Sequence, residues 1–97
     1  MEQIKSLSNF LSAISDDPRI NITHISIYAA LLKTWHDHKY ENPMSVFAYE
    51  VMRSAKISGS ATYHKSIKEL HEYGYVKYIP SYNHFIGSTI YILNLTC

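Results

Sequence analysis

One stretch, residues 46–82, constrains the fold of this chain more than any other part of the sequence. Within it a single helix is predicted from Ser58 to Gly74. Ser58 or Ser60 can cap its first turn, and Gly74 can end it because glycine adopts positive φ without a steric clash. A second helical pattern, residues 48–55, precedes this helix. The sequence therefore predicts two consecutive helices joined by a tight turn.

The helix from Ser58 to Gly74 has two different faces. The residues predicted to pack inward repeat at spacings of three or four: Tyr63, Ile67, Leu70 and Gly74. The opposite face is polar and basic: Ser60, Thr62, His64, Lys65 and Lys68. A helix with such faces lies on a core and presents its polar side chains to solvent. The polar face is therefore the candidate binding surface.

An alternating strand pattern follows this helix. Residues 75–79 and 89–94 are rich in β-branched and aromatic side chains, which predicts a hairpin. Residues 81–88 between them are too many for a two-residue turn, so we expect a projecting loop. Residues 44–46 form a short apolar run that we expect to pair with the hairpin. Helix, turn, helix and hairpin is the order typical of a winged helix-turn-helix, an α+β fold.

Two more helices are predicted near the N-terminus. Residues 3–15 have an apolar stripe at helical spacing, with Phe10 beside it: Ile4, Leu7, Leu11 and Ile14. Residues 1–20, which are this helix and its linker, either pack on the core or pair with a second copy of the chain. The next helix begins after Thr23, a good cap, and reaches about His38. Its broad apolar face predicts the central helix of the core: Ile25, Tyr28, Leu31, Leu32 and Trp35.

Length and composition favour one globular domain, residues 1–97, with a single core. Hydrophobic residues make up 46% of the chain and charged residues 18%, which is typical of a packed protein rather than a disordered one. Cys97 is the only cysteine, so no disulfide is expected within the chain and a cytoplasmic location is favoured. No apolar run approaches the ~18 to 20 residues of a membrane span, and residues 1–14 lack the apolar core of a signal peptide.

Charge is unevenly distributed along the chain, although the net charge is only +1. Residues 1–50 contain four basic and six acidic residues, and residues 51–97 contain five basic and two acidic residues, so the two halves carry −2 and +3. No acidic residue occurs in residues 51–68. The predicted helix-turn-helix is therefore the basic zone of the chain. The alternative is a solvated face with two i,i+4 ion pairs, Lys65 with Glu69 and Lys68 with Glu72.

Six short segments carry a resemblance to a known family. They are Glu50-Val-Met-Arg53, Lys56-Ile-Ser58, Ala61-Thr-Tyr-His-Lys65, Ile67-Lys-Glu-Leu-His-Glu-Tyr-Gly-Tyr75, Tyr78-Ile-Pro-Ser-Tyr-Asn83 and Gly87-Ser88. Together they resemble small winged helix-turn-helix proteins of bacterial mobile elements, most of which are assigned as transcriptional regulators. The resemblance covers residues 21–93 and implies binding of double-stranded DNA by a homodimer. The chain departs from the family pattern at Ser45-Val-Phe-Ala48, where no capping serine or threonine lies next to helix 48–55.

The candidate DNA interface combines the helix-turn-helix with the loop of the hairpin, the wing. The helix-turn-helix contributes Arg53, Lys56, Ser58, Ser60, Thr62, His64, Lys65 and Lys68, and the wing contributes Lys77, Tyr82, Asn83 and His84. Lysine side chains suit phosphate contacts. The helix from Ser58 to Gly74 carries no arginine, asparagine or glutamine, which give the best bidentate base contacts. Weak or shape-based specificity is therefore expected.

A protein-interaction module in a replication or mobilisation complex is the competing hypothesis, because a winged helix can also bind proteins. Metal binding is not expected, since zinc sites need three or four ligands and the pairs His36 with His38 and His64 with His71 provide two each. No serine lies in a catalytic motif and no glycine-rich phosphate loop is present. We therefore expect neither an enzyme nor a bound cofactor.

Overall fold

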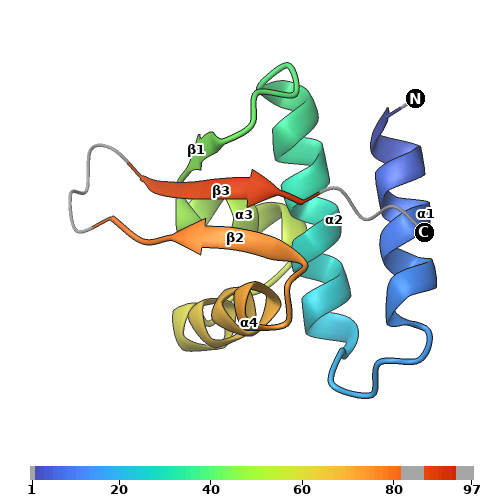
Figure 1. Cartoon of the computed structure of the whole chain (residues 1–97). Coiled ribbons are helices and arrows are strands. Elements are labelled where there is room, and N and C mark those ends of the chain that lie inside the picture. Colours follow the sequence, from blue (N-terminus) through green and yellow to red (C-terminus); the bar gives the residue numbers. More distant parts are fainter. Residues whose placement is uncertain (1, 82–86, 94–97) are drawn as a thin grey trace.

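The computed structural model describes residues 2–81 and 87–93, and the side chains within them from residue 7 onward. These residues form a small α+β structure with four helices and a three-stranded antiparallel sheet (Figure 1). The helices are α1 (Glu2–Ile14), α2 (Ile22–Asp37), α3 (Ala48–Ala55) and α4 (Ser60–Glu72). The strands are β1 (Met44–Val46), β2 (Val76–Ile79) and β3 (Ser88–Ile92).

Strand β3 lies in the middle of the sheet, in the order β1-β3-β2. Met44 of β1 is the register partner of Ile90, and Val76 of β2 is the partner of Ile92. The predicted hairpin and the predicted pairing of residues 44–46 with it are both confirmed. The loop expected at residues 81–88 lies mostly outside the described residues, since 82–86 are not described.

Gly87 lets the start of β3 come close to β1. Its φ is +77°, and a Cβ added there would lie 2.6 Å from the carbonyl oxygen of Val46. Any side chain would therefore collide with the β1 backbone, in a conformation that residues other than glycine rarely adopt. Gly87 is therefore required where the chain enters β3 beside Val46.

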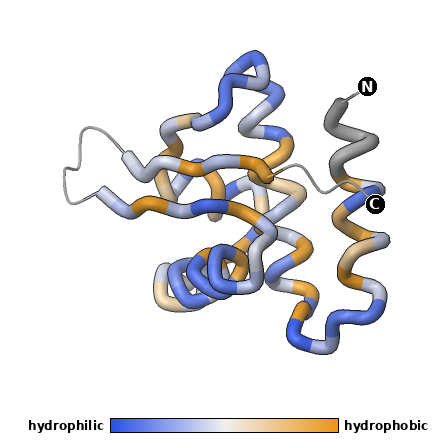
Figure 2. The backbone as a smooth tube through the Cα atoms, in the orientation of Figure 1, coloured by the Kyte–Doolittle hydropathy of each residue, from blue (hydrophilic) through white to orange (hydrophobic). Residues whose placement is uncertain are grey.

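Helix α2 is the central element of the core, as its broad apolar face predicts. It runs between α1 on one side and α3, α4 and the sheet on the other (Figure 1). Ile27, Tyr28 and Leu31 of α2 are fully buried. Apolar segments recur along α2 and the strands, whereas the loop between α2 and β1 is largely hydrophilic (Figure 2). Helix α2 thus packs against each of the other three described helices.

The start of α2 differs from the prediction. Asn21, not Thr23, is the N-cap: its side-chain oxygen accepts from the backbone N–H of His24 at 3.2 Å. In return, Nδ1 of His24 accepts from the backbone N–H of Asn21 at 3.0 Å. This reciprocal pair satisfies two backbone donors at the helix start and places the N-cap two residues before Thr23.

The start of α4 also differs from the prediction, and its end agrees. Gly59 is the N-cap, and neither Ser58 nor Ser60 makes a capping hydrogen bond. Tyr73 ends the helix, and Gly74 follows with φ +88°, while the N–H of Tyr75 donates to the carbonyl of Leu70 at 3.0 Å. Gly74 is thus the terminating residue, but it is exposed and does not belong to the inward face.

Helix α1 packs on α2 through Phe10. The ring of Phe10 is fully buried and stacks on Tyr28, with centroids 3.9 Å apart and an interplanar angle of 7°. It also meets the Tyr75 ring edge-on at 5.3 Å. Leu11, which was predicted to face inward, is 44% exposed. The larger ring of Phe10 takes the inward position, and this rotates Leu11 outward.

A polar cluster joins the α1–α2 linker to the turn after α4. The carboxylate of Asp17 accepts from the Tyr75 hydroxyl at 2.6 Å and pairs with the guanidinium of Arg19 at 2.8 Å. The guanidinium lies 4.1 Å from the centroid of the Tyr73 ring. Arg19, followed by the Tyr75 hydroxyl, holds the pKa of Asp17 well below its usual range. The linker is therefore fixed to the same turn that positions the end of α4.

Candidate nucleic-acid interface

The outer face of α4 is polar and follows the turn after α3. Ser60, Thr62, His64, Lys65 and Lys68 are all exposed. Tyr63, Ser66, Ile67 and Leu70 are buried on the opposite side. The division predicted from helical spacing is confirmed for the five exposed residues and for Tyr63, Ile67 and Leu70, whereas the burial of Ser66 was not predicted. Because the helix packs on the core with one side only, the other side is free to contact a large partner.

Glu69 does not pair with Lys65, although it lies four residues after it. Its Oε1 lies 3.0 Å from Nε2 of His24, a side chain that is 1% exposed. Since Nδ1 of His24 accepts from the N–H of Asn21, Nε2 of the neutral ring carries the proton and donates it to Glu69. The carboxylate is thereby turned toward α2 and away from the outer face of α4.

The lysines of α4 form no described ion pair. Within residues 2–81 and 87–93, no ion pair includes Lys65, Lys68 or Glu72. The two i,i+4 pairs of the solvated-face alternative are thus absent from the described structure. Both ammonium groups are exposed and unpaired among the described residues, so they are available to an anionic partner.

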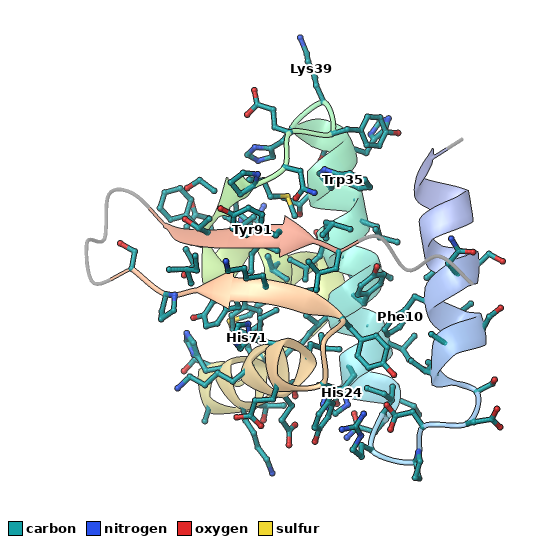
Figure 3. The ribbon with its side chains drawn as sticks, in the orientation of Figure 1. Phe10, His24, Trp35, Lys39, His71 and Tyr91 are labelled. Carbon is teal, nitrogen blue, oxygen red and sulfur yellow. The ribbon has the colours of Figure 1, made fainter. Side chains whose placement is uncertain are left out.

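A second histidine fixes the far end of α4. The backbone N–H of Tyr78 donates to Nδ1 of His71 at 3.0 Å, and Figure 3 places His71 between α4 and β2. Tyr78 lies on β2, which is an edge strand of the described sheet. The bond satisfies a donor of that edge and ties α4 to the sheet. His24 and His71 thus hold the helix near its C-terminal end.

The remaining predicted residues do not join the outer face of α4. Arg53 lies beside a polar hollow of about 350 Å³ between α2 and α3. Lys56 is the exposed C-cap of α3, with φ +63°. Lys77 is exposed on β2, and its ammonium lies 5.1 Å from the centroid of the Tyr91 ring. Since Val76 and Tyr78 point to the core, Lys77 lies on the opposite face of the sheet.

The structure describes the predicted residue of the α3–α4 turn but not those of the hairpin loop. Tyr82, Asn83 and His84 lie outside the described residues. Ser58 is exposed in the turn between α3 and α4, where it caps nothing. The start of α3 lacks a capping hydroxyl, as its sequence suggested. Instead the N–H of Phe47 donates to Oε1 of Glu50 at 3.3 Å.

A hollow of about 540 Å³ lies beside His64. It is bounded by the start of α3, the first half of α4 and both ends of the hairpin loop: Val46, Phe47, Ala48, Tyr49, Met52, His64, Ser81, Gly87 and Ser88. Tyr49 is 61% exposed, and its ring stacks on Phe47 with centroids 5.7 Å apart. Sequence reasoning did not identify these two aromatic residues, since isolated aromatics at a helix start have no distinguishing pattern.

Two further classes of site are not supported by the part of the chain that the structure describes. No group of three or more histidine, cysteine, aspartate or glutamate residues there could hold a metal ion. None of the described helices is long and apolar enough to cross a membrane.

Comparisons with models of protein families, with curated proteins and with solved structures give no match for this chain. The function must be argued from the geometry described above.

Proposed function

We propose that this chain is a winged helix protein that binds double-stranded DNA and regulates transcription, in the setting of a bacterial mobile element that its sequence resemblance implies. The observation that carries the proposal is the outer face of α4, where Lys65 and Lys68 are exposed and form no described ion pair, and where Glu69 is held by His24 instead of Lys65. The element order from β1 to β3 and the sheet order β1-β3-β2 support the winged helix assignment.

In this proposal α4 enters the major groove, whose width admits an α-helix. Lys65 and Lys68 contact phosphates, and Ser60, Thr62 and His64 face the base edges. The loop between β2 and β3 lies against the DNA backbone. Phosphate contacts position the protein without reading sequence, so most of the affinity is electrostatic.

Fluorescence anisotropy with labelled duplexes tests the proposal. Binding should weaken linearly in log affinity against log salt, with a slope of about −0.9 for each phosphate contacted. Random and genomic duplexes should bind with similar slopes, since the slope reports phosphates rather than bases. If no salt-sensitive binding occurs even at low ionic strength, the proposal is wrong.

A docking module in a replication or mobilisation complex is the second candidate. It is favoured by the hollow beside His64, where Tyr49 is 61% exposed next to Phe47. Exposed aromatic side chains are enriched where proteins bind one another. A partner that is retained after nuclease treatment, together with absence of DNA binding, would favour this candidate over the first.

We also propose that the chain acts as a homodimer, because a lone module of this size has little surface for tight specific binding and such regulators read two half-sites. The sequence offers two candidate contacts, the helix of residues 3–15 and residues 95–97. Residues 95–97 lie outside the described residues, and the contact argued here is the outer face of α1. Residues 6–15 carry no charge, and Leu11 is 44% exposed. A hollow of about 610 Å³ there is lined by Leu7, Ser8, Leu11, Ser12 and Ser15.

Sedimentation equilibrium at micromolar concentration is expected to give twice the chain mass of 11.2 kDa. Leu11→Glu should reduce this to one chain mass, because a charge placed in an apolar contact is costly to desolvate. Ser45→Glu, which adds the same charge at an exposed position of β1, is the matched control and should stay dimeric. A parent protein with the mass of one chain would contradict the dimer.

A further inference from the structure

The ring of His64 is held by two contacts. Its Nδ1 lies 2.8 Å from the carbonyl oxygen of Ser60, one turn earlier on α4. Its plane meets the buried ring of Tyr63 edge-on, at 5.1 Å between centroids and an angle of 78°. The side chain is exposed and yet oriented, unlike a freely rotating surface histidine.

The contact with Ser60 determines which ring nitrogen of the neutral His64 carries the proton. A carbonyl oxygen only accepts hydrogen bonds, so Nδ1 must be the donor. The other nitrogen, Nε2, is then an acceptor when the ring is neutral. No described residue donates to Nε2 of His64. The outer face of α4 therefore presents one oriented, unpartnered acceptor.

We propose that His64 determines base specificity, by presenting Nε2 to the exocyclic amino group of adenine or cytosine in the major groove. This inference rests on the proposed binding of DNA by α4. In the major groove the N6 amino group of adenine and the N4 amino group of cytosine are donors. Guanine offers O6 and N7 and thymine offers O4, which are acceptors and cannot bond to Nε2 of the neutral ring.

The neighbours of His64 cannot make this distinction. Lys65 and Lys68 are donors without an acceptor, and the hydroxyls of Ser60 and Thr62 both donate and accept. Ser60 and Lys68 lie one turn before and one turn after His64, so the three residues follow the same line along the helix. Nε2 of His64 therefore lies between the hydroxyl of Ser60 and the ammonium of Lys68, on a helix face whose lysines attract phosphate.

Selection from randomised duplexes at about pH 8, where neutral histidine predominates, gives the first test. The parent should enrich adenine or cytosine at one position. His64→Ala should lose that preference, and His64→Lys, which has donors only, should change it to guanine. His36→Ala removes an exposed histidine from α2 and is the matched control, which should select as the parent does.

Deletion of the amino group from the selected base gives the second test. Purine in place of adenine, or 2-pyrimidinone in place of cytosine, should weaken binding by the parent roughly five- to ten-fold, and binding by His64→Ala less than about two-fold. Equal losses for both proteins, with salt-sensitive binding intact, would overturn the role of His64 and leave the DNA proposal standing. If no duplex binds at low salt, both proposals fail together.

Discussion

The Lys65→Ala, Lys68→Ala double variant is expected to lose about two units of the slope of log affinity against log salt. Each lysine that neutralises a phosphate releases condensed counterions, which contributes about 0.9 to the slope and roughly ten-fold in affinity near 0.1 M salt. Both side chains are exposed, and no described carboxylate pairs with either of them. Affinity near 0.1 M salt should therefore fall about fifty- to one hundred-fold, equally for all duplexes.

Lys33→Ala, Lys39→Ala is the matched control, because it removes the same charge from the opposite end of the molecule. Lys33 pairs with Asp37 at 2.6 Å, and Lys39 projects from the end of α2, far from α4 (Figure 3). The control should keep most of the slope. Equal effects of the two double variants would show that total charge matters and not the face of α4. If Lys65→Ala, Lys68→Ala binds like the parent, the docking module becomes the better hypothesis.

The exposed face of α4 could be predicted from sequence because helical periodicity separates buried from exposed positions. Tyr63, Ile67 and Leu70 repeat at three- and four-residue spacing, and all three are buried. Local patterns of this kind also gave the bounds of α3 and the strands of the hairpin to within one or two residues. These predictions depend only on residues within one turn of a helix or within one strand, where backbone geometry determines which side chains share a face.

The contact that turns Glu69 away from Lys65 could not be predicted. His24 and Glu69 are 45 positions apart, and only the packing of α2 against α4 brings them together. Sequence spacing instead favoured the pair of Glu69 with Lys65. The contact of Glu69 with His24 is more favourable than an ion pair of Glu69 with Lys65. Leaving the buried Nε2–H of His24 without an acceptor would be costly, whereas an exposed ion pair contributes little to stability.

The caps were mispredicted for a related reason. Several residues near each helix start carry a side-chain oxygen, and the cap is the one whose backbone is extended just before the first turn. Asn21 has φ −125° and is the N-cap of α2, while Thr23 lies within the helix. At α4 the extended residue is Gly59, so neither neighbouring serine can cap. Which residue becomes the N-cap depends on the backbone conformation of the segment before the helix, and residue type alone does not determine that conformation.

The Phe10→Ala variant is expected to lower the free energy of unfolding by about 3 to 5 kcal/mol, the usual range for removing a buried phenylalanine ring. The ring is fully buried, stacks on Tyr28 at 3.9 Å and meets Tyr75 edge-on. Its loss leaves a void between α1 and α2 and removes one ring contact of Tyr75, the residue bonded to Asp17. Urea denaturation followed by circular dichroism measures the change.

Leu11→Ala is the control for this prediction, because Leu11 neighbours Phe10 on the same helix and is 44% exposed. Its expected effect on the monomer is below about 1 kcal/mol, since only part of its apolar area is buried. The free energy of unfolding of a small domain is only about 5 to 15 kcal/mol, so Phe10→Ala should remove a large part of it. Equal effects of the two variants, measured at a concentration where sedimentation gives one chain mass, would mean that α1 does not pack through Phe10. The outward position of Leu11, on which the dimer proposal depends, would then be wrong as well.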